Sequence, residues 1–206
     1  GAARLEALVN ALVFERVIVP IDVEPDPRVT GVHAGDSGHN PIDFVRVQTP
    51  AGEALAIYSS VRALSAHRPG DRPMALDFRT IGLTALIETG GRVVVNPGTD
   101  AVLLPRPAVS ALAQGDQWLP AWRDVALRDL LFAEANAVCS AITDLSITYA
   151  GGGLTRVIVS VERSCFTGAA NASAMKQSLT QALSHVGANR RLIASADRVE
   201  IAPILV

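Results

Sequence analysis

Four side chains that could carry out chemistry lie in one glycine-rich stretch: His33, Asp36, Ser37 and His39. A serine becomes a nucleophile when a histidine within hydrogen-bond distance takes its proton and a carboxylate orients that histidine. Two histidines with an aspartate between them are also residue types that bind zinc. The stretch therefore supports the hypothesis of a small-molecule or metal-dependent enzyme, and the same four residues are candidates for a binding site.

The rest of the sequence does not complete either kind of active site. Gly35-Asp36-Ser37-Gly38 is similar to the nucleophile loop of chymotrypsin-like proteases, but His33 is only four residues upstream of Ser37, whereas those enzymes place histidine and acid far upstream. A GDSL hydrolase would need Asp-x-x-His near its C-terminus, and no histidine stands beside the last acids of the chain. A zinc site would need further ligands from the same segment. We therefore expect no catalytic residue, no metal and no cofactor, and interpret 24–40 as a long loop.

A second glycine-rich run, Gly151-Gly152-Gly153, has the composition of a phosphate-binding loop. Such loops lead from a strand into a helix, whose N–H groups then face the phosphate. Here apolar segments typical of strands stand on both sides, at 145–149 and 154–161. The run is therefore predicted to be a hairpin turn.

Composition and charge argue against two classes of partner. The 206-residue chain has a formal net charge of −2, and its arginine pairs are too sparse for a surface that binds nucleic acid. No apolar run approaches the roughly 18–20 residues of a membrane-spanning helix, so we expect no membrane segment. Cys139 and Cys165 lack the spacing of a metal site. We expect two thiols in a reducing cytoplasm, while a disulfide between them stays open.

The first half of the chain is predicted to mix helices with strands joined by hairpins. Apolar residues at helical spacing between Leu5 and Val13 predict an amphipathic helix. Gly90-Gly91 can supply the positive φ that ends a helix, and Asn96-Pro97-Gly98 predicts a type II turn. The predicted strands are 17–23, 44–48, 54–58, 74–76, 93–95 and 102–104, with a five-residue turn at 49–53 and helices after Ser60, near Ile81 and near Val109.

The second half is predicted to form a lobe of its own. The turn-rich segment 115–120 is flanked by Trp118 and Trp122, which we expect to close a seam between lobes. We predict an α+β protein with two domains, 2–116 and 117–206, because each half has its own helix and strand faces. The later elements are a helix at 123–142, strands at 145–149 and 154–161, a helix at 169–186 stopped by Gly187, and short strands at 192–193 and 199–206.

Several short segments of the first half carry a resemblance to a known family. They are the strand Val17–Ile21, the hairpin end Ala56–Ser60, Met74 and the stretch Arg92–Gly115. Together they resemble the N-terminal domain of the SseB family, bacterial proteins named after enhanced serine sensitivity, with a related usage around type III secretion. The Asn96-Pro97-Gly98 turn is the most specific element, whereas Ile57-Tyr58 departs from the aromatic that members usually show there. The resemblance implies an α+β fold and an accessory, interaction or regulatory domain without an established catalytic residue.

From this resemblance and the incomplete catalytic sets we predict a non-enzymatic bacterial accessory or protein-interaction module in the cytoplasm. Loops on a rigid scaffold carry most binding, so we place the binding surface on the long loop and on the turn. We expect a protein partner, and neither nucleic acid nor membrane. The C-terminal strand, interrupted by Pro203, is predicted to lie at a sheet edge that is covered within the chain or in a homodimer. The expected binding residues are His33, Asp36, Ser37, His39, Asn96 and Gly98.

Overall fold

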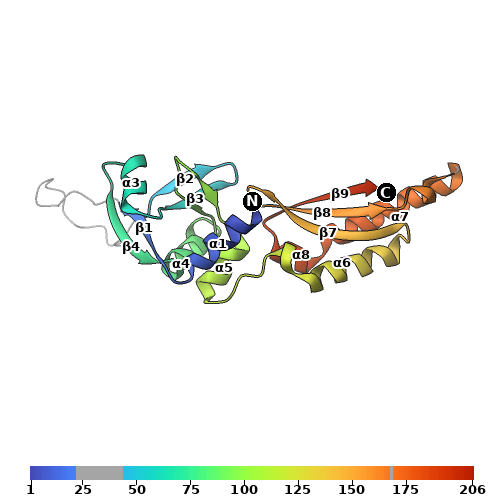
Figure 1. Cartoon of the computed structure of the whole chain (residues 1–206), viewed down its shortest axis with the longest axis horizontal. Helices are drawn as coiled ribbons and strands as arrows, with labels where there is room; N and C mark the ends of the chain where they lie inside the picture. Colours follow the sequence, from blue (N-terminus) through green and yellow to red (C-terminus); the bar gives the residue numbers. More distant parts are fainter. Residues whose placement is uncertain (22–43, 168) are drawn as a thin grey trace, which may run out of the picture. The chain divides into compact units, whose positions relative to one another are not determined.

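The computed structural model describes residues 1–21, 44–167 and 169–206, which have the predicted α+β architecture (Figure 1). They divide into two compact units, one made of Leu5–Gln117 and the other of Trp118–Val206 with Gly1–Arg4. None of the described helices combines the length and the apolar character that crossing a bilayer requires. The division into domains 2–116 and 117–206 stays a prediction.

The larger sheet of the first unit contains one parallel pair of strands. Strands β3 and β5 run in the same direction, and the other neighbours in this sheet are antiparallel. The carboxyl ends of β3 and β5 therefore meet at one edge. The strand order is β2 (Arg46–Thr49), β3 (Gly52–Ile57), β5 (Val93–Val95) and β6 (Val102–Leu103).

A smaller antiparallel sheet joins this edge. It pairs β1 (Arg16–Ile21) with β4 (Arg72–Asp77). Tyr58, directly after β3, links the two sheets: its N–H donates to the carbonyl of Ile18 at 2.7 Å, and its carbonyl accepts from the Ile18 N–H at 2.9 Å. Tyr58 is fully buried, so the joint between the sheets is part of the core.

The predicted stripe of α1 is buried only as far as Leu12, since the helix ends there and Val13 is exposed, whereas α3 begins as its sequence predicts. Helix α1 (Ala2–Leu12) buries Leu5, Val9 and Leu12, which lie on one face because they are four or three residues apart. Helix α3 (Val61–His67) starts at Ser60, whose Oγ accepts the N–H of Ala63 at 3.1 Å. The hydroxyl therefore caps the helix.

Helices α4 (Phe78–Glu88) and α5 (Arg106–Gln114) pack closely against each other. A Cβ on Gly82 would lie 3.0 Å from the Cβ of Ala113, so the contact depends on a glycine facing an alanine. After α4, Gly90 and Gly91 have φ values of +60° and +80°, and the Gly91 N–H donates to the Ala85 carbonyl at 2.7 Å. The two glycines end this helix as predicted.

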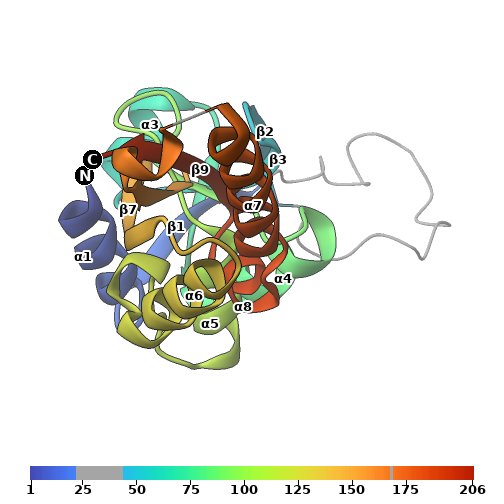
Figure 2. The same cartoon turned by 90° about the vertical axis from the view of Figure 1, so that its right-hand side faces the viewer.

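The second unit is a three-stranded sheet with helices on one face (Figures 1 and 2). Its order is β7-β8-β9, antiparallel and then parallel. Alternate residues of β8, Val157, Val159 and Val161, are fully buried against α6 and α7, which lie side by side. The elements are η1 (Ala121–Arg123), α6 (Val125–Val138), β7 (Ile142–Gly151), β8 (Leu154–Val161), η2 (Arg163–Phe166), α7 (Ala169–Ala188), α8 (Arg190–Ser195) and β9 (Arg198–Leu205).

Strand β9 lies at the edge of this sheet, as predicted. The Val206 N–H donates to the Val161 carbonyl, and the Val206 carbonyl accepts the N–H of Arg163. Counting back from Val206, every second residue of β9 therefore directs its backbone N–H and carbonyl toward β8. Pro203 falls on the alternate set, which faces away, and its missing N–H removes no ladder bond. The side chains of Ile204 and Leu205 are 45% and 54% exposed, so the described residues do not supply the expected cover there. A homodimer as the cover stays a prediction.

The two tryptophans pack inside the second unit. The rings of Trp118 and Trp122 meet edge to face with centroids 5.6 Å apart, and Trp122 lies 4.9 Å from Tyr149 of β7. Their expected place in a seam between lobes stays a prediction. Cys139 and Cys165 form no disulfide with each other, and the Cys139 Sγ lies 3.6 Å from the sulfur of Met175.

Three sequence-based boundaries are wrong. The helix predicted to reach Ile142 ends at Val138, because Ile142 begins β7, where the Asn136 side chain donates to its carbonyl at 2.8 Å. Gly187 lies inside α7 rather than after it. The turn between β2 and β3 has two residues, at 50–51, rather than five.

The strand predicted at Leu192-Ile193 is also wrong, because these residues belong to helix α8. Asn189 explains the difference: its Oδ1 accepts the N–H groups of Arg191 and Leu192 at 3.0 and 3.1 Å. A side-chain cap thus starts a helix where two apolar residues alone indicated a strand.

Candidate functional site

Two of the predicted binding residues, Asn96 and Gly98, lie at the edge where β3 and β5 end. Ser59 and Ser60 follow β3, and the turn 96–99 follows β5. Because the two strands are parallel, both loops emerge on the same edge of the sheet. The carboxyl edge of parallel strands is where ligands bind in many α/β proteins. We take these two loops with His67 as the candidate site and call them the β3–β5 edge.

The side chain of Asn96 holds the two loops together. Its Oδ1 accepts the backbone N–H of Ser59 at 2.9 Å and lies 3.3 Å from the Ser59 Oγ, and its Nδ2 donates to that Oγ at 3.0 Å. The Asn96 N–H donates to the Ile57 carbonyl at 2.8 Å. With φ at +49°, Asn96 has the left-handed backbone that asparagine tolerates better than most residues. Both the oxygen and the nitrogen of the Asn96 side-chain amide are thus hydrogen-bonded to Ser59 within the β3–β5 edge.

The turn after β5 has the geometry that its sequence predicts. The Thr99 N–H donates to the Asn96 carbonyl at 3.3 Å, and Gly98, at the third position, has φ of +88°. Pro97 at the second position is buried, whereas Gly98, Thr99 and Asp100 are exposed. The turn therefore exposes short side chains and backbone to solvent, while the buried Pro97 anchors it to the protein.

His67 closes the edge from α3. Its Nδ1 lies 2.8 Å from the Tyr58 hydroxyl, and a Cβ on Gly98 would come within 2.2 Å of its Cδ2, so the ring occupies the space beside the glycine. Burial raises the pKa of Tyr58, the nearby Arg68 lowers it, and Asp71 raises it again. The net effect is a rise, so the phenol keeps its proton at neutral pH, and its oxygen lies within hydrogen-bond distance of the His67 Nδ1.

A family model described as the SseB protein N-terminal domain matches residues 1–111. The chain belongs to the SseB family. The match extends from α1 into α5 and includes both loops of the β3–β5 edge, so the joint made by Asn96 and Ser59 lies within the SseB domain. Comparisons with curated proteins and with solved structures find no match.

The other candidates of this SseB protein fall in two places. His33, Asp36, Ser37 and His39 lie outside the described residues. Gly151 ends β7, and Gly152 and Gly153 form the predicted hairpin turn to the antiparallel β8, so this run joins two strands rather than leading from a strand into a helix as a phosphate-binding loop does. Within residues 1–21, 44–167 and 169–206, no three His, Cys, Asp or Glu side chains are grouped as a metal site would require.

Sequence reasoning missed the role of His67. The sequence suggests only a cation at the end of a short helix, since histidine is favoured in a last turn. The structure places the ring between Tyr58 and Gly98, which are 9 and 31 residues away in the chain. The sequence held only an indirect signal, the glycine at position 98. The φ of the turn requires a glycine there, and so does the His67 ring beside it.

Proposed function

We propose that this SseB protein is a non-enzymatic accessory module that binds a protein partner through the β3–β5 edge. One observation carries the proposal: the polar side chains at this edge bond to one another, Asn96 to Ser59 and Tyr58 to His67. Groups satisfied in this way stabilise a scaffold, and a rigid scaffold with exposed loops is suited to binding.

The surface offered to the partner is short and preorganised. Ser59, Val61 and Thr99 are exposed around the edge, with Val61 exposed on 47% of its surface. The backbone beneath them is fixed by the cap at Ser60 and by the turn hydrogen bond of Thr99. A partner would therefore bind without first ordering this edge. We place the protein in a bacterial cytoplasm, because the family resemblance is bacterial and both cysteines are reduced thiols, as a reducing compartment keeps them.

Affinity capture with two matched variants tests the proposal. Thr99→Arg puts a long charged side chain on the exposed turn, and Thr80→Arg puts the same side chain on an exposed position of α4 in the same unit. We expect the wild type and Thr80→Arg to capture the same partner and Thr99→Arg to lose it. If the wild type captures no partner and instead turns over a small molecule in a reaction that Ser37→Ala abolishes, the proposal is wrong and the enzyme hypothesis replaces it.

A further inference from the structure

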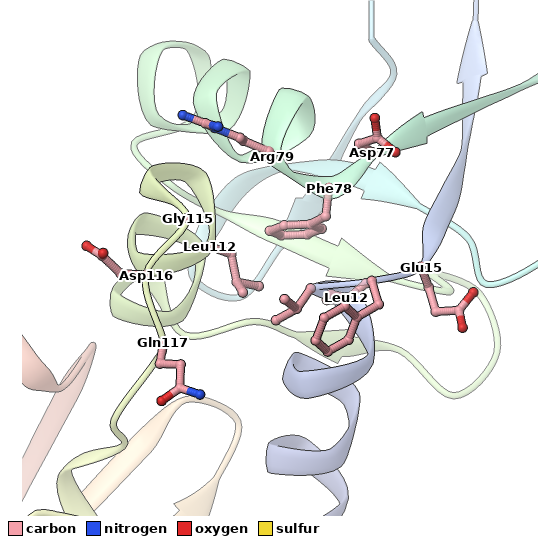
Figure 3. A pocket seen from close by; sticks show the side chains of 11 residues that line it. Leu12, Glu15, Asp77, Phe78, Arg79, Leu112, Gly115, Asp116 and Gln117 are labelled. Carbon is pink, nitrogen blue, oxygen red and sulfur yellow. The ribbon is translucent and has the colours of Figure 1, made fainter.

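A pocket in the first unit lies where α1 ends, α4 begins and α5 ends (Figure 3). Leu12, Phe78 and Leu112 converge on its apolar floor (Figure 3). Phe14 and Val13 also line it and are exposed on 87% and 50% of their surfaces. The geometry points to a docking pocket for one apolar side chain of a protein partner, with basic residues beside that side chain. This goes beyond the proposed function, because the residues that line the pocket are not part of the β3–β5 edge and the inference gives the chemistry of the segment that this second surface binds.

Backbone hydrogen bonds at the C-terminal ends of α1 and α5 fix the walls of the pocket. After α1, the N–H groups of Phe14 and Glu15 donate to the Ala11 carbonyl at 3.1 and 3.0 Å. At the end of α5, Gly115 has φ of +84° and the Asp116 N–H donates to Ala111 at 2.8 Å. The exposure of Phe14 therefore comes from an ordered backbone. A preformed apolar wall binds without the entropic cost of ordering a loop.

The size of the pocket favours a single side chain. Its volume is about 210 Å³, which is below the roughly 300–1,000 Å³ of pockets for drug-sized ligands and cofactors. Protein interfaces commonly concentrate their affinity in one apolar or aromatic anchor that fills such a pocket. The exposed lining residues, Val13 and Phe14, would supply most of the contacts of that anchor, because Phe78 and Leu112 beneath them are almost fully buried.

Acidic side chains dominate the rim. Glu15, Asp77 and Asp116 line the pocket together with one cation, Arg79, whose guanidinium donates to a backbone carbonyl of α5 at 3.3 Å. Arg16 forms an exposed ion pair with Asp77 at 3.6 Å. The carboxylates of Glu15 and Asp116 point away from the apolar floor (Figure 3). An anchor flanked by arginine or lysine would meet these two carboxylates, and such complementary charge steers association and sets specificity.

Synthetic peptides test the pocket directly on the full chain. Three labelled short peptides would carry a central leucine flanked by Arg, by Ser or by Glu. A fourth, the control for the anchor, would be flanked by Arg and carry a central serine. Fluorescence anisotropy would give the affinity of each peptide for the chain. We expect the Arg-flanked leucine peptide to bind most tightly. Phe14→Ala should weaken it about tenfold, a typical effect for an anchor contact. Asp116→Lys should weaken it several-fold and reduce the salt dependence of binding.

Ile87→Ala is the matched control, because Ile87 lies on α4 in the same unit, is 86% exposed and does not line the pocket. It should leave peptide affinity unchanged. Equal effects of Phe14→Ala and Ile87→Ala, or equal binding of the leucine and serine peptides, would overturn the inference. So would a dimer that dissociates in Phe14→Ala, since a second copy would then be the occupant. If the wild type and Phe14→Ala capture a partner equally and Thr99→Arg does not, this inference fails while the proposed function stands.

Discussion

Replacing Gly98 with alanine is expected to destabilise the first unit by about 2–6 kcal/mol. The backbone at Gly98 has φ of +88°, and holding a non-glycine residue in such a region costs about 1–3 kcal/mol. The new Cβ would lie 2.2 Å from the Cδ2 of His67, so the ring must move and its 2.8 Å contact with Tyr58 is lost. A buried hydroxyl left without a partner adds about 1–3 kcal/mol.

Scanning calorimetry of the full chain measures this effect, and a drop in melting temperature on the order of 10 °C is expected for a unit of this size. Trp118 and Trp122 both belong to the second unit, so tryptophan fluorescence reports that unit separately. Gly70→Ala is the control, because Gly70 has no atom within 4 Å of an added Cβ and no positive φ. It should change the free energy of unfolding by less than about 0.5 kcal/mol.

A double-mutant cycle separates strain from collision. In a His67→Ala background the ring is absent, so Gly98→Ala should cost only its backbone term. An equal cost in both backgrounds would refute the contact between Gly98 and His67. A cost no larger than that of Gly70→Ala would refute the backbone argument as well.

Three further results are expected. Asn96→Ala should lower the free energy of unfolding by about 0.5–1.5 kcal/mol in urea titrations, because it removes the hydrogen bonds that join the turn to Ser59, and Asn96→Asp, which keeps the acceptor for the Ser59 N–H, should lower it less. Gly82→Val should cost about 1–3 kcal/mol in the same assay, since even a Cβ there meets Ala113 at 3.0 Å, and an equal result for Gly70→Val would contradict this packing. Desolvation raises the pKa of Asp124, but a backbone N–H and Arg191 outweigh it and hold that pKa below 3.8. The stability that Asp124 contributes is therefore present at neutral pH and lost as the pH falls below about 4, and Asp124→Asn should flatten this acid-side slope.

The features predicted correctly from sequence are those decided by neighbours in the chain. The cap at Ser60, the helix end at Gly90-Gly91, the type II turn at 96–99 and the hairpin at Gly151–Gly153 each depend on a few hydrogen bonds between residues close in sequence. Their side-chain or φ requirements restrict the residue types, so the types predict the structure. The α+β class follows from the same local elements.

The missed features depend on residues far apart in the chain. The contact of His67 with Gly98 requires α3 to end over the edge of a sheet whose parallel pairing is not visible in the sequence. The pocket brings together the end of α1, the start of α4 and the end of α5, and nothing in the apolar stripe from Leu5 to Val13 indicates an exposed Phe14 beside it. At Leu192-Ile193 an apolar pair favoured a strand, but the cap from Asn189 determined a helix.

Backbone hydrogen–deuterium exchange of the chain with and without its captured partner tests the central claim most directly. Amides in a contacted surface exchange more slowly when the partner is bound, and each segment is followed separately. The account predicts slower exchange at Ser59–Val61 and at Thr99–Asp100, with α7 unchanged. Slower exchange confined to the second unit, or none at the β3–β5 edge, would contradict it.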